Sequence, residues 1–532
     1  MARPGALTSR LAGGWRGLQR RVRGSALGPG VDHWLHVPIE GDPDEWHAPG
    51  LFRRHPPPSL LDWLRCLDRA ADDPRVAGVV LELRGEAGSP SAHAALRRAV
   101  DRLRAASKQT LAWVDGPGLL QYALAARCDR VLAPESARLN LLGLRIEQFY
   151  FKDLLDSLDV RPDVVHVGRY KSAAEPATRR SMSDTQREQL EAWQGGFFSS
   201  LVAAIAEGRG LPEERVHALI DEALLPARHA LEAGLIDGCC YADEIESKIV
   251  PAEGGAGRAR IRAARHVDAA RYLELDVKAW DGARSPIGGA VDVAYWVLEG
   301  SIGRSGRSGI ALDAFRQIAE ELRVDPNVRA VVLRIDSPGG DALVSDLMHR
   351  EIVRLRAEKP VVASFGDVAA SGGYYLATAA DEIHAEPASL TGSIGVVGGK
   401  VDLSKLYARL GVVKESVGHG ARSGLFSEAS PFSAPERRAL GRELGEIYDI
   451  FLRRVADGRG LERDEVKRIA EGRVWSGAAA IELGLVDRLG GPLEALERAC
   501  RRAGLEPFEH PRLRVLPRPV PWARPMALVP GL

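Results

Sequence analysis

The sequence contains little cysteine, no long hydrophobic run and none of the common cofactor motifs. Its five cysteines have neither metal-site nor disulfide spacing, and we expect ordinary thiols at Cys66, Cys128, Cys239, Cys240 and Cys500. No stretch approaches the roughly 18 to 20 apolar residues that cross a bilayer, and the N-terminus has no signal-peptide core. The chain is therefore not expected to span a membrane.

Motifs for metals and nucleotides are also missing. The sequence has no HExxH pair, no cluster of Cys and His, no P-loop and no dinucleotide-binding glycine fingerprint. We therefore expect neither a metal nor a cofactor. Lys and Arg together number 72, as do Asp and Glu, so no net charge favours a nucleic-acid partner.

Local charge is uneven at the N-terminus. The basic leader, residues 1–30, contains six arginines and no acidic residue. Within it, residues 7–22 place apolar side chains at helical spacing, a pattern typical of peripheral contact with an anionic membrane surface. Glycines in the same stretch weaken a helix, so a disordered leader is the alternative. Peripheral membrane association is the expected location, and the cytoplasm is the alternative.

The chain is an internal duplication. Its 532 residues, 45% hydrophobic and 27% charged, are enough for about two soluble globular domains. Four segments recur in the same order, first at a separation of 252 residues and then of 250: 73–83 with 325–335, 122–129 with 374–381, 208–211 with 458–461, and 232–237 with 482–487. Such repetition indicates two copies of one fold.

Each copy alternates apolar runs with amphipathic stretches. This pattern predicts an α/β fold of two tandem domains, with parallel sheets covered by helices. We expect strands at 76–83, 109–114, 328–335 and 360–365, helices near 91–106 and 342–357, and closing helical stretches at 183–233 and 433–483. The predicted parts are the leader 1–30, an N-terminal domain 31–250, a linker 251–289, a C-terminal domain 290–508 and a Pro/Arg-rich tail 509–532.

Ser371 is the first candidate for catalysis. It follows an apolar run and precedes Gly372, Gly373 and a helical stretch, so its hydroxyl lies where backbone donors and a helix start converge. A serine at a helix start is also a common N-cap. The first copy has Leu119 at the matching position, which favours a nucleophile over a cap.

Other polar groups are likewise present in one copy alone. Ser393 falls on Leu141, and the second copy's loop 336–341, Asp-Ser-Pro-Gly-Gly-Asp, loses its Pro-Gly-Gly in the first. Conversely, Lys171 of the first copy falls on Ala421. Lysines are mostly exposed, so Lys171 alone would indicate a surface residue. Its pairing with the unmatched serines makes it a candidate base.

A serine and a lysine can form a nucleophile and base. The lysine must act as a neutral amine, so burial, for example at a domain interface, has to lower its pKa from about 10.4 to roughly 7–8. Ser393 could hold that amine. The developing oxyanion needs donors, and we expect the N–H of Gly372 and one from Gly339 or Gly340.

A Ser–His–Asp arrangement is the alternative to check. The nearest following histidine, His384, lies in an expected strand, and we interpret it as a strand residue. Asp336 and Asp341 flank the Gly-Gly turn, where turn formation is the expected role.

The Tyr-Lys171-Ser-Ala, Asp-Ser-Pro-Gly-Gly, Ala-Ser371-Gly-Gly-Tyr-Tyr and Thr-Gly-Ser393-Ile-Gly motifs resemble the long form of bacterial signal peptide peptidases of the SppA type. These are serine proteases of the ClpP/crotonase-like fold. The resemblance covers about residues 35 to 505. It implies Ser371 as nucleophile, Lys171 as general base and Ser393 as the partner of the lysine.

The resemblance also implies apolar peptide substrates such as remnant signal peptides, an apolar groove where the two halves meet, and a homotetramer. Family members usually carry a membrane-spanning N-terminal anchor, and the Arg-rich leader departs from that pattern.

Two other functions compete with a Ser/Lys endopeptidase. A crotonase-type acyl-thioester enzyme also uses paired backbone N–H groups as an oxyanion hole, but it would need neither Lys171 nor Ser371. A non-catalytic scaffold of the same fold is the third possibility, which the intact Ser/Lys pair disfavours.

Overall fold

The chain forms two compact α/β units. The computed structural model describes residues 33–46, 58–85, 88–249, 265–269, 272–273, 293–305, 309–505 and 513–517. Unit 1 comprises residues 1–143, 200–292 and 510–532, and unit 2 comprises residues 144–199 and 293–509. The leader 1–30, with its stretch 7–22, and most of the linker and tail lie outside the described residues.

Unit 1 contains a six-stranded parallel sheet in the order β8-β4-β3-β2-β1-β9. The strands are β1 (His33–Glu40), β2 (Val76–Arg84), β3 (Gln109–Val114), β4 (Arg130–Ala133), β8 (Gly238–Cys239) and β9 (Arg265–Asp268). Apolar runs form the central strands because both faces of a parallel sheet are covered. β9 pairs with β1, so part of the expected linker is an edge strand.

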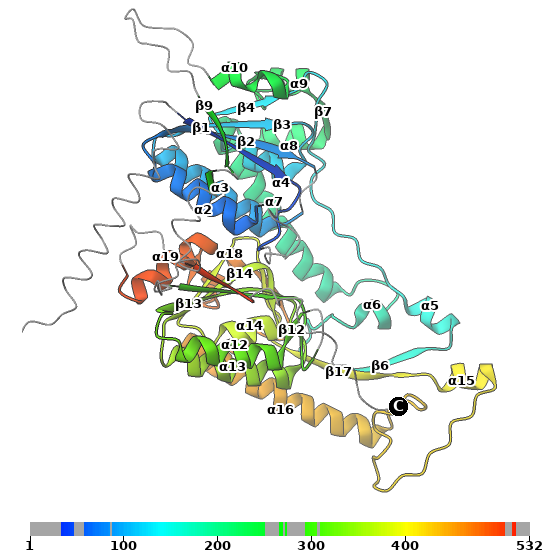
Figure 1. Cartoon of the computed structure of the whole chain (residues 1–532). Coiled ribbons are helices and arrows are strands. Elements are labelled where there is room, and N and C mark those ends of the chain that lie inside the picture. Colours follow the sequence, from blue (N-terminus) through cyan, green and yellow to red (C-terminus); the bar gives the residue numbers. More distant parts are fainter. Residues whose placement is uncertain are drawn as a thin grey trace, which may run out of the picture. The chain divides into compact units, whose positions relative to one another are not determined.

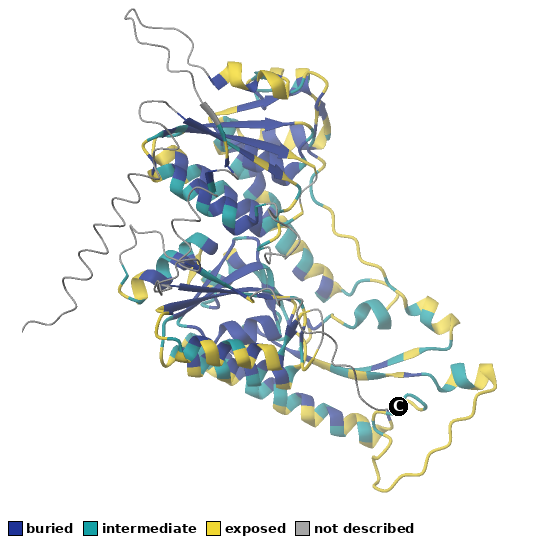
Figure 2. Cartoon of the chain, viewed as in Figure 1, coloured by how far each residue is buried: buried dark blue, intermediate teal, exposed yellow. Residues whose placement is uncertain are grey.

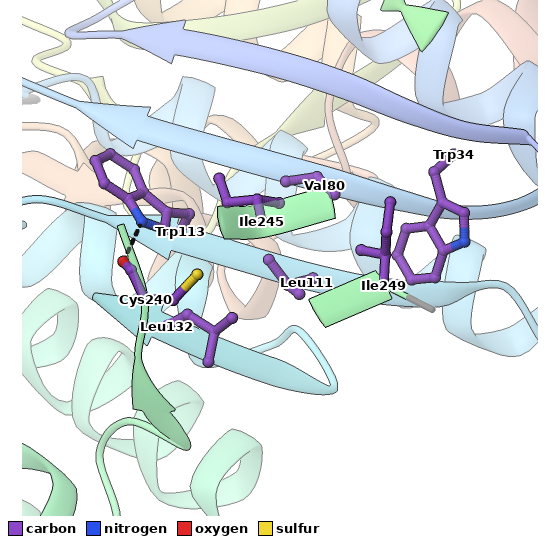
Figure 3. Packing of buried hydrophobic residues seen from close by; sticks show 8 residues of the cluster. All are labelled: Trp34, Val80, Leu111, Trp113, Leu132, Cys240, Ile245 and Ile249. Carbon is purple, nitrogen blue, oxygen red and sulfur yellow. Dashed lines mark hydrogen bonds between the residues drawn. The ribbon is translucent and has the colours of Figure 1, made fainter. Parts of the chain in front are cut away.

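Helices cover this sheet on both sides (Figure 1). They are α2 (Leu60–Asp72), α3 (Pro90–Ala105), α4 (Leu119–Ala125), α8 (Glu213–Asp221), α9 (Ala227–Glu232) and α10 (Ile245–Ile249), with the short β5 (Arg138–Asn140) and β7 (Leu224–Pro226) beside them. Ser59 and Asp62 form a capping box at α2. On one face, Ile245 and Ile249 of α10 pack against Trp34 and Trp113, and Trp113 donates its indole N–H to the Cys240 carbonyl at 2.9 Å (Figure 3).

Unit 2 repeats the sheet with additions. Its strands run in the order β18-β16-β14-β13-β10, with β15 beside β14 and β19 beside β15. They are β10 (Val293–Glu299), β13 (Ala330–Ser337), β14 (Val361–Ala370), β15 (Glu382–Ala385), β16 (Leu390–Gly392), β18 (Val474–Ser476) and β19 (Arg488–Leu489), and β18 is antiparallel to β16. The expected tandem α/β fold with parallel sheets is confirmed.

Helices of unit 2 also lie on both faces of its sheet (Figure 1). They include α12 (Leu312–Val324), α13 (Ala342–Arg356), α14 (Gly372–Ala377), α16 (Ala434–Arg459), α17 (Arg463–Ile469), α18 (Gly477–Glu482) and α19 (Pro492–Arg502). Short strands β11 (Ile302–Gly303) and β12 (Ile310–Ala311) form a small pair, and β20 (Leu513–Leu516) falls within the Pro/Arg-rich tail.

The residues shared by the two copies make the same framework contacts. Tyr122 donates its hydroxyl to the Leu235 carbonyl at 2.6 Å, and Tyr374 donates to Leu485 at 2.9 Å. The ion pair of Arg209 with Asp237 recurs as Arg459 with Asp487. The repeated motifs are therefore structural, as expected for a duplication.

The boundaries of the compact units differ from the domain boundaries expected from the sequence. Residues 144–199, assigned by sequence to the N-terminal domain, belong to unit 2. The physical reason is β6 (Arg161–Val167), which pairs antiparallel with β17 (Val396–Asp402) along its whole length. Helix α7 (Asp184–Arg209) contributes its first part to unit 2 and its last part to unit 1. Lys171 thus lies in the same compact unit as Ser371, although its segment was assigned by sequence to the N-terminal domain.

We call the part of unit 2 built around this β6–β17 pair the arm. It includes α5 (Lys152–Ser157), α6 (Glu175–Thr178), α15 (Ser404–Leu410) and the loops that flank these elements. Figure 2 shows that the sheet of unit 2 is buried, whereas much of the arm is intermediate or exposed. Several large apolar side chains of the arm are solvent-exposed, among them Phe149, Leu154, Leu410, Val413 and Phe426.

Candidate active site

Ser371 lies at the junction of β14 and α14. Its φ of 53° is in the left-handed region, which non-glycine residues rarely adopt. Two hydrogen bonds hold this backbone: the Ser371 N–H donates to Gly392 O at 2.9 Å, and the Tyr375 N–H donates to Ser371 O at 2.8 Å. Although Ser371 occupies the N-cap position of α14, its side chain makes no cap bond. The hydroxyl is therefore available for another partner.

That partner is Lys171. Its Nζ is 3.0 Å from Ser371 Oγ, 3.0 Å from Ser393 Oγ and 2.9 Å from the Ser393 carbonyl oxygen. The lysine is 8% exposed, and burial lowers the pKa of its amine to about 8. The structure thus brings the three expected side chains together within one chain and one unit, so the burial does not require an interface between domains.

Close backbone contacts hold the loop that carries Lys171 in place. The Tyr170 N–H donates to the Glu471 carbonyl at 2.8 Å. At Gly472, whose φ is +76°, a Cβ would lie 2.6 Å from the Lys171 nitrogen, and at Gly168 it would lie 2.6 Å from the Glu471 carbonyl carbon. Side chains at either glycine would therefore displace the lysine.

A partly exposed polar network supports the same loop. The Arg473 guanidinium stacks between the rings of Tyr170, at 4.9 Å, and Trp475, at 4.4 Å, and pairs with Glu188 at 2.8 Å. The Arg473 carbonyl accepts the Ser393 N–H at 2.7 Å. Arg473 therefore links the lysine loop to Ser393.

Sequence reasoning missed Gly472 and Arg473, although a signal was present. At the separation of 250 they fall on Glu222 and Ala223 of the first copy. Comparing the two copies beyond the recognised motifs would have marked both positions.

Two backbone N–H groups near Ser371, those of Gly340 and Gly372, have no hydrogen-bond acceptor among the described residues. A Cβ on Gly372 would lie 3.2 Å from the Gly340 nitrogen, so the two amides are close. The Gly339 N–H instead donates to Ser337 Oγ at 3.1 Å. Gly340, not Gly339, is thus the available second donor.

Gly339 has a different role. Its φ is +97°, and a Cβ there would lie 2.5 Å from the Gly372 nitrogen. Glycine at this position keeps the Gly372 N–H open to a ligand. Glycine is therefore required at both positions 339 and 340, because a Cβ on Gly340 would overlap the Ile302 carbonyl oxygen.

The remaining candidates have structural partners. His384 lies in β15, and its Nε2 is 3.1 Å from Glu382 Oε1, which confirms the strand interpretation. Asp341 caps α13 by accepting the Val344 N–H at 2.9 Å. Asp336 was expected to form a turn, but it is the last residue but one of β13, with its carboxylate directed at β14.

A hydroxyl, a buried amine and two free N–H groups together can support acyl transfer. Among the described residues, no three His, Cys, Asp or Glu side chains are arranged to hold a metal ion. Over the same residues, no helix has both the length and the apolar character that crossing a bilayer would need.

Comparison with known proteins places the chain in a peptidase family. The model of peptidase family S49 matches residues 102–251 and 353–506, which together exceed half of the chain. The chain is 33% identical to the chloroplastic serine protease SPPA of Arabidopsis thaliana over 459 residues, which cover 85% of this chain and 67% of that protein.

Bacterial relatives match over a similar length. Protease 4 of Haemophilus influenzae is 30% identical over 455 residues, covering 83% of this chain and 72% of that protein, and Protease 4 of Salmonella typhi is 30% identical over 462 residues, covering 84% and 72%. The chain therefore belongs to peptidase family S49 and is a serine-type peptidase.

Proposed function

We propose that Ser371 is the nucleophile and Lys171 the general base of an endopeptidase. The observation that carries this proposal is the 3.0 Å contact between Lys171 Nζ and Ser371 Oγ. Because burial lowers the pKa of the amine to about 8, a useful fraction is neutral near neutral pH and can accept the serine proton.

In the proposed reaction, Lys171 Nζ takes the proton from Ser371 Oγ as the oxygen attacks a peptide carbonyl. The N–H groups of Gly340 and Gly372 stabilise the resulting oxyanion, and each such donor typically contributes about 3 kcal/mol. The Lys171 ammonium then protonates the leaving amine while Ser393 Oγ and O accept its other N–H groups. Water, activated by the neutral lysine, releases the acyl group from Ser371.

The proposed substrates are apolar peptides such as cleaved signal peptides. One relative, 34% identical over 179 residues, is named a putative signal peptide peptidase SppA, from Enterococcus faecium. Hydrolysis of a panel of quenched peptides that differ only in central side chains tests this class. Faster cleavage of charged than of apolar centres would contradict it.

We also propose a homotetramer that associates peripherally with membranes. The exposed apolar side chains of the arm, including Phe149, Leu410 and Val413, favour burial against a partner. Light scattering of the purified chain tests the tetramer. A truncation that starts at Val31 and still sediments with anionic vesicles would contradict attachment through residues 7–22.

Labelling with a fluorophosphonate serine probe tests the catalytic pair. The wild type should be labelled, whereas Ser371→Ala and Lys171→Ala should not. Ser157→Ala and Lys152→Ala are matched controls, because Ser157 is exposed and Lys152 partly exposed on α5. Absence of labelling in the folded wild type would contradict the proposal and favour a thioester enzyme or a scaffold of the same fold.

A further inference from the structure

A carboxylate lies between the two strands that lead to the active site. Asp336 is near the end of β13, just before the Ser-Pro-Gly-Gly loop, and β14 leads to Ser371. The strands pair Ile335 with Phe365 and then Ser337 with Ala369, with a register shift between these pairs. Asp336 alone therefore lies opposite a bulge of β14, residues 366–368.

The Asp336 side chain fills this bulge. Its Oδ2 accepts the Asp367 N–H at 3.0 Å and its Oδ1 accepts the Val368 N–H at 3.3 Å. Any Cβ on Gly366 would overlap Asp336 Oδ2, so the carboxylate packs directly on the bulge backbone. Both oxygens are used as acceptors, which an ionised carboxylate does better than a protonated one.

The bulge is connected to both halves of the site. Val368 at the end of the bulge and Ala369 and Ala370 beyond it pair with β16, and the Ser371 N–H donates to Gly392 O. On the other strand, Ser337 Oγ fixes the Gly339 N–H. How β13 and β14 are held together thus determines where Ser371 lies relative to Gly340 N–H.

We propose that the ionised Asp336 carboxylate is a positioning residue for the Ser371–Lys171 site, holding the β14 bulge in the shape that aligns Ser371 with the Gly340 N–H. This inference rests on the proposed function. Protonation of Asp336 withdraws the support and lowers the rate of acylation at Ser371.

The surroundings place this protonation in an accessible pH range. Burial is the main cause that raises the pKa of Asp336, to about 6, and the negative charge of Asp367 on β14 adds to it. The two backbone N–H groups and Arg334 of β13 lower the pKa, and Glu299 is the paired residue on β10. Asp336 therefore changes charge below the pH range in which Lys171 does.

The first copy lacks the carboxylate, and its β2–β3 pairing ends where the bulge begins in the second copy. Arg84 falls on Asp336 at the separation of 252. In that copy β2 and β3 pair without a shift through Leu83 with Val114. The copy with Leu119 in place of the serine thus also lacks this support.

The test is the rate of fluorophosphonate labelling of the full chain between pH 5 and 9, with circular dichroism at each pH to confirm folding. For the wild type we expect the rate to fall about tenfold per pH unit below pH 8 and more steeply around pH 6, where protonation of Asp336 removes about a further tenfold in total. Asp336→Asn should keep the tenfold slope throughout and lower the plateau roughly tenfold.

Two further variants separate positioning from folding. Asp367→Asn removes a negative neighbour, so the steep part of the profile should move to lower pH. Asp449→Asn, which removes a surface partner of Arg463, should leave the profile unchanged. If the role of Asp336 were purely structural, Asp336→Asn would lower the folded fraction, and the pH dependence of the labelling rate would keep the wild-type slope.

The outcomes distinguish the two proposals. The role of Asp336 is overturned if the wild-type labelling rate falls only tenfold per pH unit down to pH 5. It is also overturned if the rate of Asp336→Asn steepens around pH 6 as the wild-type rate does. Either result leaves the Ser/Lys pair intact. An unlabelled folded wild type at every pH overturns both.

Discussion

The starts of α4 and α14 are equivalent places in the two copies, yet they differ in both backbone and chemistry. Gly118 precedes α4 with a φ of −73°, followed by buried Leu119, whereas Ser371 precedes α14 with a φ of 53°. Neither helix has a side-chain cap bond at its start. A side-chain N-cap is thus not needed at the start of this helix. The presence of Ser371 and its strained backbone therefore need another explanation.

Unit 1 and unit 2 also differ in what surrounds this turn. In unit 2, the arm supplies Lys171 through the β6–β17 pair, and the glycines at 339 and 472 allow close backbone approach. The matched framework, such as Tyr122 and Tyr374, is the same in both. The comparison teaches that duplication preserved the scaffold while the proposed catalytic groups and their backbone strain are concentrated in one unit.

The largest expected effect comes from exchanging the differing residues. Ser371→Ala should lower kcat/KM by roughly 10⁴-fold or more, because no nucleophile remains. The double variant Ser371→Ala/Leu119→Ser should stay inactive, since the α4 start lacks the positive φ. Peptide hydrolysis measures both, and recovery of activity in the double variant would break the comparison.

The oxyanion loop gives the next largest effect. Gly339→Ala places a Cβ 2.5 Å from the Gly372 nitrogen, and we expect kcat to fall roughly 10²- to 10³-fold. Gly88→Ala in the first copy is the control, because its Cβ would meet Asp42 Oδ2 at 3.4 Å. Equal losses in steady-state kinetics for the two variants would show that the loops do not differ in function.

The pH dependence should follow Lys171. Only the neutral amine accepts a proton, so kcat/KM should rise about tenfold per pH unit up to about pH 8 and then level. A pH–rate profile between pH 6 and 9.5 measures this rise. A profile that is flat across this range would show that Lys171 is not the base.

The smallest expected effect is on stability. The pKa of Lys171 is lower in the folded chain than in the unfolded chain, so holding the proton below about pH 8 costs free energy, and stability rises as the pH increases above that value. Lys171→Met should therefore raise the free energy of unfolding by about 1 to 3 kcal/mol at pH 7.

Urea denaturation provides the measurement, and Lys152→Met is the control because Lys152 is paired with Asp156 on the surface of α5. A destabilised Lys171→Met would mean that the three hydrogen bonds of the amine outweigh its burial.

Much of the fold could be predicted from local patterns. The expected strand 109–114 coincides with β3, and the expected helices 91–106 and 342–357 lie within one residue of α3 and α13 at each end. Periodicity and apolar runs are local properties, so they need no knowledge of distant contacts. The same holds for the duplication, which is visible by comparing the chain with itself.

The site was predicted in part. Ser371, Lys171 and Ser393 stood out because the copies differ there, and the structure brings all three together. The choice of Gly340 over Gly339 depends on the bond from the Gly339 N–H to Ser337 Oγ. The roles of Arg473 and Asp336 depend on partners at positions that sequence spacing does not reveal.

The sequence by itself determined the family, the two-copy α/β architecture and the candidate catalytic side chains, because each is encoded in residue types and their order. Tertiary structure alone decided that residues 144–199 join unit 2, that burial lowers the pKa of Lys171, and that Asp336 fills a bulge of β14. These properties arise from contacts between residues far apart in the chain, where solvent exclusion and backbone register depend on the whole unit.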